Sequence, residues 1–199
     1  MDLLRYERSL LEKGHNLICG IDEAGRGPLA GPVTVAAVIM DMDNIVSGVN
    51  DSKQLSEKTR ERLYEEVLAA AIGYNVVSIN CDVIDEINIL NATKRAMKKA
   101  VEGLFPLPDI LLVDAVKDDF GLPSLSIIHG DALSYSIAGA SILAKVERDR
   151  IMRKYAEIYP EYGFEQHKGY ATKLHIERLK KYGPCPIHRK SFIGKILGE

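Results

Sequence analysis

Short apolar runs rich in β-branched residues recur along the chain, separated by longer segments with the apolar spacing of amphipathic helices. The short runs predict strands over residues 16–21, 33–40, 74–79, 110–113 and 125–128. The helical spacing predicts helices over 56–71, 82–104, 134–158 and, as the last helix, 172–182. Grouped strands followed by strand–helix alternation are typical of an α/β domain, with a mixed sheet covered by helices.

Local signals refine these helices. Ser56 is a suitable N-cap for the first, and the second is expected to be interrupted near residues 88–91. The first half of the 134–158 helix is small and apolar, which lets a helix approach a sheet or a neighbouring helix closely. Gly183-Pro184 ends the 172–182 helix.

Size and composition narrow the class of protein. With 199 residues, of which 46% are hydrophobic and 27% charged, the chain fits one globular domain and excludes disorder or a fibrous repeat. No apolar run is long enough to span a membrane, and the first residues lack the continuous apolar stretch of a signal peptide. Three scattered cysteines do not make a disulfide framework. We therefore expect a cytoplasmic protein that acts without a membrane.

The net charge of −2 conceals an uneven distribution. Residues 1–144 hold 13 Lys and Arg against 21 Asp and Glu, a charge of −8, whereas residues 145–199 hold 13 against 7, a charge of +6. The acidic part could hold cations and the basic part a polyanion. The alternative is that both runs are solvated surface.

Three of the predicted strands end in acidic residues. Asp22 and Glu23 follow the first strand, Asp114 follows the fourth, and Asp131 comes shortly after the fifth. If these strands are neighbours that leave the sheet at one edge, the carboxylates converge, repel one another and require a cation. Oxygen ligands without Cys or His favour Mg²⁺ or Mn²⁺, and two such ions about 3.5–4 Å apart form the clamp used by nucleases. The alternative is that each acid caps a turn or a helix.

The glycine-rich loop after Glu23 fits neither of two common phosphate-binding motifs. It lacks the Lys-Ser/Thr of a P-loop, and it leads into a strand, so no helix N-terminus is available for a pyrophosphate. Gly25-Arg26-Gly27 remains a segment of flexible backbone with one guanidinium, suited to close approach of a nucleic-acid strand. A plain tight turn is the alternative.

Two further segments could contact a nucleic acid. Ser52 and Lys53 lie in a loop before a helix start, where a hydroxyl, an ammonium and backbone N–H groups can bind phosphate or simply cap the helix. Lys168 and Tyr170 place a cation beside an aromatic ring that can stack on a base or sugar, or pack as a half-buried loop residue. Cys185 and His188 lack the partners for a metal site.

Taken together, these segments resemble ribonuclease HII, the bacterial type 2 ribonuclease H family, over residues 18–192. The motifs that carry the resemblance are Gly20–Pro32, Asp51–Leu55, the strand end at Asp114, Gly130-Asp131, Ala140–Val146, His167–Tyr170 and Pro186–Phe192. The resemblance implies a single ribonuclease H-like catalytic domain over 1–199, in which 160–199 form a basic helical subregion. A ribonuclease HIII-like nuclease, or a non-catalytic nucleic-acid-binding module, is the alternative.

The resemblance also implies an activity and a site. The enzyme would hydrolyse the RNA strand of RNA–DNA hybrids and cut 5′ of single ribonucleotides in duplex DNA, leaving 5′-phosphate and 3′-hydroxyl ends. We also expect a monomer whose cofactor is Mg²⁺ or Mn²⁺, with two ions during catalysis. The implied catalytic residues and metal ligands are Asp22, Glu23, Asp114 and Asp131. The implied substrate-binding residues are Gly25, Arg26, Gly27, Ser52, Lys53, Lys168 and Tyr170.

Two positions depart from the family pattern. Ala115 follows Asp114 where the family usually has glycine, so the local turn could differ although the carboxylate is kept. His129 precedes Gly130-Asp131 where a lysine is common, which could weaken a phosphate contact or make it depend on pH.

Overall fold

A computed structural model describes residues 2–198 of the chain, and five strands form one mixed sheet within them in the order β3-β2-β1-β4-β5. The strands are β1 (Ile18–Ala24), β2 (Val33–Met40), β3 (Ala71–Ile79), β4 (Ile110–Asp114) and β5 (Ser124–Ile127). The helices are α1 (Arg5–Leu11), α2 (Glu57–Ala70), α3 (Cys81–Glu102), α4 (Gly130–Leu133), α5 (Tyr135–Ile158), α6 (Phe164–His167), α7 (Lys173–Tyr182) and α8 (Lys190–Leu197), with a short 3₁₀ turn η1 (Ser52–Gln54).

The strand directions bring the ends of three strands to one edge of the sheet. β2 runs antiparallel to both β1 and β3, whereas β4 is parallel to β1 and β5 is parallel to β4. The carboxyl ends of β1, β4 and β5 therefore leave the sheet on the same side, as the convergence of the acidic residues requires. The predicted α/β fold with a mixed sheet is confirmed.

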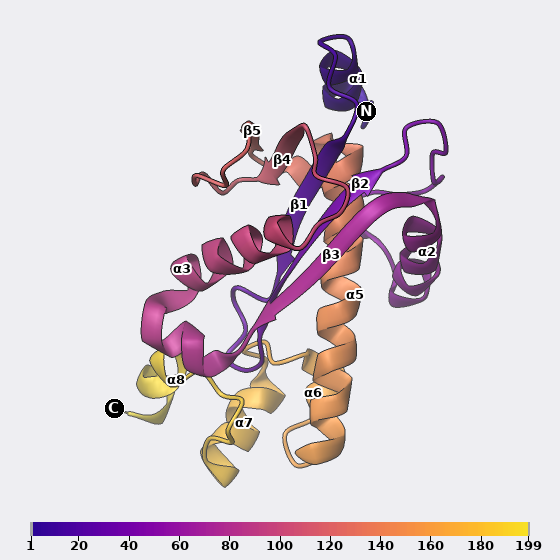
Figure 1. The fold of residues 1–199 in the computed structure, drawn as a ribbon. Helices are drawn as coiled ribbons and strands as arrows, with labels where there is room; N and C mark the ends of the chain where they lie inside the picture. The colour runs from indigo at the N-terminus through magenta and orange to yellow at the C-terminus, as the bar shows by residue number, and fades with distance from the viewer. Residues whose placement is uncertain (1, 199) are drawn as a thin grey trace.

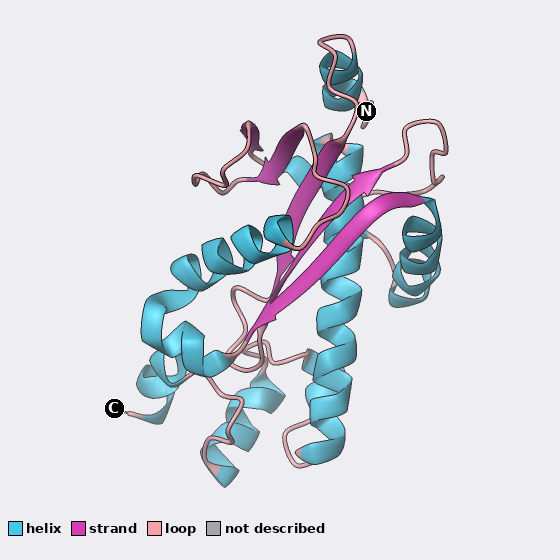
Figure 2. Cartoon of the chain, in the orientation of Figure 1, coloured by secondary structure: helices cyan, strands magenta, loops and turns pink. Residues whose placement is uncertain are grey.

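Helices cover both faces of the sheet, with α3 on one face and α5 on the other (Figures 1 and 2). Alternate residues of β2 point to opposite faces, as in any strand. Val35 and Ile39 belong to the core beneath α3, whereas Val38 and Met40 belong to the core shared with α2 and α5. Burial on both faces explains why β2 is a continuous apolar run.

The small residues of α5 allow it to lie directly against the sheet, as the sequence predicts. A Cβ on Gly139 would lie 3.1 Å from the sulfur of Met40 in β2. The approach is closer still at Gly20 in β1, where a Cβ would lie 2.1 Å from the backbone of Ser136. Since no side chain fits there, glycine is required at the crossing of β1 and α5.

The local signals for helix ends are confirmed. Ser56 caps α2 by accepting a hydrogen bond from the N–H of Thr59. The interruption expected near 88–91 occurs at Asn88, whose φ of 65° breaks α3 into two segments. Gly183 follows the last residue of α7.

Two expectations about the ends of elements are wrong. The 172–182 helix is not the last, because α8 follows it. Helix α8 was missed because it has only eight residues, of which only Ile193 is fully buried, so its apolar pattern is short. Asp22 and Glu23 do not lie beyond the first strand but within it, because β1 continues to Ala24 through pairing with β2.

None of the helices between residues 2 and 198 has both the length and the apolar character to cross a membrane.

Candidate active site

Three acidic side chains meet where the carboxyl ends of the strands leave the sheet, and a fourth, Glu23, lines the cavity beside them. Asp22 and Glu23 project from β1, Asp114 is the last residue of β4, and Asp131 lies in the first turn of α4. One carboxylate oxygen from each of Asp22, Asp114 and Asp131 lies within 4.8 Å of the other two. Asp22 and Asp131 are almost completely buried, so water screens their charges weakly.

Burial and mutual repulsion destabilise the charged forms of these carboxylates. Desolvation raises the pKa of Asp22 well above its usual value, and the charges of Glu23 and Asp114 raise it further. Burial also raises the pKa of Glu23 and of Asp114, although Arg26 and the N–H of Gly130 respectively oppose these rises. The protein alone therefore leaves the negative charge of this cluster poorly compensated.

The cluster has the properties of a site for a hard divalent cation. Its donors are all carboxylate oxygens, which suit Mg²⁺ or Mn²⁺. Glu23 Oε2 is buried and makes no hydrogen bond within the described residues, so it is free to act as a ligand. The ammonium of Lys53 lies 2.7 Å from Asp131 Oδ2 and supplies positive charge at the rim. The residues present thus fit the cation that their pattern predicts.

A cavity of about 220 Å³ brings most of the sequence-predicted residues together. It is lined by Asp22, Glu23, Ala24, Gly25, Arg26, Gly27, Ser52, Lys53, Asp114, Ser141, Lys145 and Tyr170. The glycine-rich loop, the 52–53 turn and Tyr170 come from distant parts of the sequence, yet all face the carboxylates. This arrangement places polar backbone, a cation and an exposed ring around one acidic centre.

Sequence reasoning assigned no role to Ser141 and Lys145, which lie on the cavity-facing side of α5. The hydroxyl of Ser141 lies 2.8 Å from that of Ser52. Lys145 is held by Asp149 one turn later in α5, at 2.7 Å. Their spacing of four residues puts both on one face of a helix, and this was the signal available in the sequence.

Two fully buried arginines donate hydrogen bonds to backbone carbonyls in and around the glycine-rich loop. Arg189 donates to the carbonyls of Gly25, Arg26 and Gly31. Arg148 donates to three carbonyls in the same region, those of Ala30, Pro32 and Lys168. Because guanidinium offers five fixed donors, each arginine fixes several turns of backbone at once. The role of these arginines was not predicted from the sequence.

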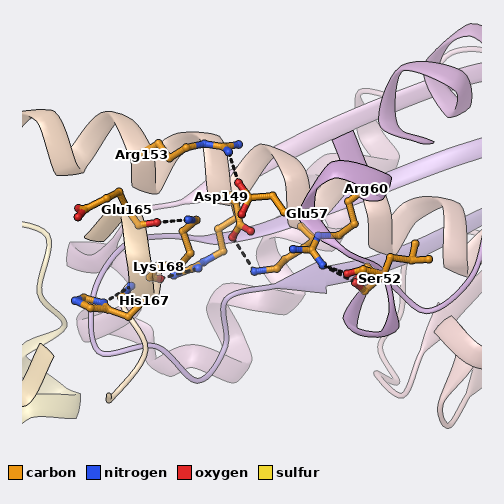
Figure 3. A network of polar contacts seen from close by, with 12 residues as sticks. Ser52, Glu57, Arg60, Asp149, Arg153, Glu165, His167 and Lys168 are labelled. Atoms are coloured by element: carbon orange, nitrogen blue, oxygen red, sulfur yellow. Dashed lines mark hydrogen bonds and ion pairs between the residues drawn. The ribbon is translucent and has the colours of Figure 1, made fainter. Parts of the chain in front are cut away.

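The two residues singled out in the 167–170 segment have different environments. Tyr170 is 43% exposed, and its ring lies beside the cavity with Lys145 Nζ 5.9 Å from the ring centre. Lys168 is buried, and its ammonium donates to the carbonyl of Glu165, as Figure 3 shows. The structure therefore brings Tyr170 to the acidic centre but does not bring Lys168 to it.

Both departures from the family pattern adopt left-handed backbone. Ala115 has a φ of 49°, and the N–H of Val116 donates to the carbonyl of Asp114, forming a three-residue turn. This conformation favours glycine, but Asp114 still reaches the cluster. His129 has a φ of 57° and is exposed beside the same turn.

The fold and the acidic cluster can be compared with known proteins. Ribonuclease H2 from Pyrococcus horikoshii OT3 superposes with a TM-score of 0.78 at 30% identity, over 91% of this chain and 97% of that one. Together, the sheet and the acidic cluster define a metal-dependent nuclease of the ribonuclease H class.

The amino-acid sequence specifies the family. Residues 19–195 match the family model for ribonuclease HII. Ribonuclease HII of Caldicellulosiruptor saccharolyticus is 56% identical over 192 residues, covering 96% of this chain and 94% of the relative. The chain belongs to the ribonuclease HII family. Bst-RNase HIII, solved in complex with Mn²⁺, shares the fold with a TM-score of 0.67 but only 19% identity, over 92% of this chain and 65% of that one.

Proposed function

We propose that this endoribonuclease hydrolyses the RNA strand of RNA–DNA hybrids and cuts 5′ of single ribonucleotides embedded in duplex DNA. The observation that supports this substrate most directly is the composition of the cavity. Three of the carboxylates, the glycine-rich loop and Tyr170 border the same 220 Å³ space: Asp22, Glu23, Asp114, Gly25-Arg26-Gly27 and Tyr170. The fourth carboxylate, Asp131, lies beside Asp22 and Asp114. Such a site can hold a phosphate, a ribose hydroxyl and a neighbouring sugar at the same time.

In this proposal, Asp22, Glu23, Asp114 and Asp131 hold Mg²⁺ or Mn²⁺, two ions during catalysis. The chemistry that such ions would supply there is a lowered pKa for a bound water and stabilisation of a leaving 3′-oxygen, as hydrolysis to 5′-phosphate and 3′-hydroxyl products requires. The N–H of Gly130 donates to Asp114 Oδ1 at 2.7 Å and orients that ligand. The N–H of Glu23 orients Asp22 Oδ1 in the same way, also at 2.7 Å.

The remaining cavity residues recognise the substrate. The Gly25-Arg26-Gly27 backbone contacts the 2′-hydroxyl, the group that distinguishes RNA from DNA. Ser52 and Lys53, which both line the cavity, contact phosphate. The Lys53 side chain is 74% exposed at the rim, whereas Ser52 is buried and its hydroxyl shares a hydrogen bond with Ser141. The ring of Tyr170 stacks on the sugar that follows the ribonucleotide. Lys168 contributes through the turn that carries Tyr170, because its own ammonium is bound to Glu165.

The test is cleavage of a DNA duplex with one internal ribonucleotide, assayed with Mg²⁺ and then with Mn²⁺, beside an all-DNA duplex of the same sequence. We expect a cut 5′ of the ribonucleotide and an intact DNA control. Asp22→Asn should lower the rate by about 10³-fold or more, because it removes an anionic ligand at the reacting phosphate, while duplex binding persists. Binding without any cleavage by the unaltered chain would favour the non-catalytic module.

Tyr170→Ala tests the stacking role. The variant should lose the preference for a lone ribonucleotide over a continuous hybrid. Tyr182→Ala is the matched control, because Tyr182 is similarly exposed, at 44% against 43%, but lies outside the cavity. An unchanged substrate preference in Tyr170→Ala would reject this role.

A further inference from the structure

Three histidines form a buried cluster behind the turn that carries Tyr170. His175 and His188 are almost fully buried and lie with their Nε2 atoms 3.0 Å apart. His167 stacks on His175 with ring centres 4.4 Å apart. None of the three lines the acidic cavity, so they have no place in the proposed chemistry. Their hydrogen bonds, however, lead to Tyr170.

The partners of His175 determine where its proton lies. Nδ1 is 2.9 Å from the carbonyl oxygen of Tyr170, and a carbonyl can only accept a hydrogen bond. His175 Nδ1 therefore carries the proton, and in the neutral ring Nε2 is an acceptor. Burial lowers the pKa of His175 to about 4, which is consistent with a neutral ring.

The partners of His188 lead to the complementary tautomer. Since His175 Nε2 accepts, the proton between the two rings must belong to His188 Nε2. His188 Nδ1 is then an acceptor, and the backbone N–H of Cys185 donates to it at 2.9 Å. The Cys185 carbonyl, 3.3 Å from the same Nδ1, already accepts from the backbone N–H of His188 at 3.0 Å, so it needs no proton from the ring. The assignments made from Tyr170 and from the N–H of Cys185 therefore agree on one proton arrangement.

These hydrogen bonds hold the backbone of Tyr170 more firmly than its own turn requires. The Tyr170 carbonyl already accepts from the N–H of Thr172 at 2.8 Å, so His175 supplies a second donor to a satisfied group. The N–H of Tyr170 donates to the carbonyl of His167 at 2.9 Å, and His167 Nδ1 accepts from Gly169. The backbone is thereby fixed on both sides of an otherwise exposed ring.

We propose that His175 is a positioning residue for the nuclease reaction: held in its Nδ1–H tautomer by His188, it fixes the Tyr170 backbone and so aims the Tyr170 ring at the substrate. This inference rests on the proposed role of Tyr170 in substrate recognition. It goes further because it makes the preference for a lone ribonucleotide depend on the tautomer of His175, a buried residue outside the cavity. The alternative is that the three histidines only fill the core.

The tautomers can be measured without substrate. In the full-length ¹⁵N-labelled protein, long-range ¹H–¹⁵N correlation spectra distinguish Nδ1–H from Nε2–H imidazole. We expect His175 to carry its proton on Nδ1 and His188 to carry its proton on Nε2. A proton on Nε2 of His175 would overturn the proposal, because the bond to Tyr170 would then be absent.

Two variants of His175 separate positioning from core filling. The amide nitrogen of Asn can take the place of Nδ1 and keep the bond to Tyr170, whereas the amide of Gln extends to the position of Nε2 and keeps only the contact with His188. Both variants remove the same ring, so both should lower the melting temperature to a similar extent.

The readout is the ratio of kcat/KM for a lone-ribonucleotide duplex to kcat/KM for a continuous RNA–DNA hybrid. His175→Gln should lower this ratio about tenfold, the effect expected for one lost hydrogen bond, while His175→Asn should keep it within about threefold. Equal ratios in the two variants would overturn the positioning role.

Tyr170→Ala, assayed in parallel, distinguishes the failure of one proposal from that of the other. If Tyr170→Ala loses the substrate preference and the two His175 variants behave alike, the role of Tyr170 stands and the positioning role of His175 is rejected. If Tyr170→Ala keeps the preference, the ring has no part in recognition, and the positioning role falls with it.

Discussion

Two regions of this molecule bury charged or titratable groups, and they do so in opposite ways. At the sheet edge, Asp22, Asp114 and Asp131 are held within 4.8 Å of one another, and the pKa of Asp22 and of Asp114 is raised. Behind the glycine-rich loop, Arg148 and Arg189 are fully buried as well. Between them, however, they donate to six backbone carbonyls.

The difference shows which region is prepared for a ligand. A buried charge is costly unless hydrogen bonds or opposite charges compensate it. The arginines and the three histidines have hydrogen-bond partners within the protein, and their contribution is to hold loops in place, although burial lowers the pKa of Arg189 to about 9. The carboxylates are compensated only in part and need a cation. Carboxylates that repel one another therefore mark the reacting centre, whereas buried groups whose hydrogen bonds are made within the protein mark its support.

The largest expected effect tests the supporting region. Arg189→Met should lower the free energy of unfolding by about 3 kcal/mol or more, because three backbone carbonyls lose a charged donor. Chemical denaturation measures this loss. Arg8→Met is the control: Arg8 is 60% exposed and paired with Asp2, so its removal should cost less than about 1 kcal/mol. Equal costs in the two variants would mean that the buried arginine is not a support.

The acidic region should respond to cations instead. At a concentration 100 times its Kd, Mg²⁺ should raise the free energy of unfolding by about 2.7 kcal/mol, because it binds the folded cluster and not the unfolded chain. Asp22→Asn should reduce this gain without destabilising the metal-free protein, since it removes a repelled charge. Thermal unfolding with Mg²⁺ and with a chelator measures both effects. Asp43→Asn, at an exposed acid outside the cluster, should keep the full gain.

Acid should destabilise the histidine cluster. The pKa of His175 and of His188 is lowered from 6.5 to about 4, mainly by burial, so between these values the unfolded chain binds protons that the folded protein does not. Stability is therefore complete above about pH 6.5 and falls as the pH decreases towards 4. The neighbouring ionisable groups are Glu165 and Lys168 beside His167, and Cys185 beside His188.

Between about pH 6.5 and 4, the free energy of unfolding should fall by about 2 kcal/mol or more. Denaturation at several pH values measures this loss, with Mg²⁺ present to compensate the acidic cluster. His188→Gln should flatten this dependence on pH. His15→Gln, at a histidine outside the cluster, should leave it unchanged. If the free energy of unfolding of the unaltered protein does not change with pH, the histidine cluster accepts protons without destabilising the fold.

The smallest effect concerns the turn that presents Asp114. Ala115 has a φ of 49°, which strains any residue with a Cβ, so Ala115→Gly should raise the free energy of unfolding by up to about 1 kcal/mol. Ala69→Gly, at an exposed position in helix α2, should instead lower it by about 0.5–1 kcal/mol. Denaturation curves of both variants provide the comparison. Destabilisation by Ala115→Gly would show that the turn is not strained.

The acidic half of the site could be predicted from the sequence because its signals are local. Each acid comes at or near the end of an apolar run, and the directions of three strands bring these ends together. The buried arginines and histidines that hold the loops around the site could not be predicted in this way. Arg189 and Gly25 are 164 positions apart, and nothing near either residue indicates that a guanidinium will meet that carbonyl. The same holds for His175 and His188, which meet only after α7 has packed.

By itself, the sequence of this ribonuclease HII family member determined the strands, the main helices, the small residues of α5, and the acids at the ends of the strands. These follow from side-chain periodicity, chain stiffness and charge, which act over a few residues. The tertiary structure alone decided that Lys168 turns to Glu165 while Tyr170 faces the carboxylates, and which backbone carbonyls the buried arginines hold. Such choices depend on desolvation and on partners that become neighbours only when the whole chain has folded.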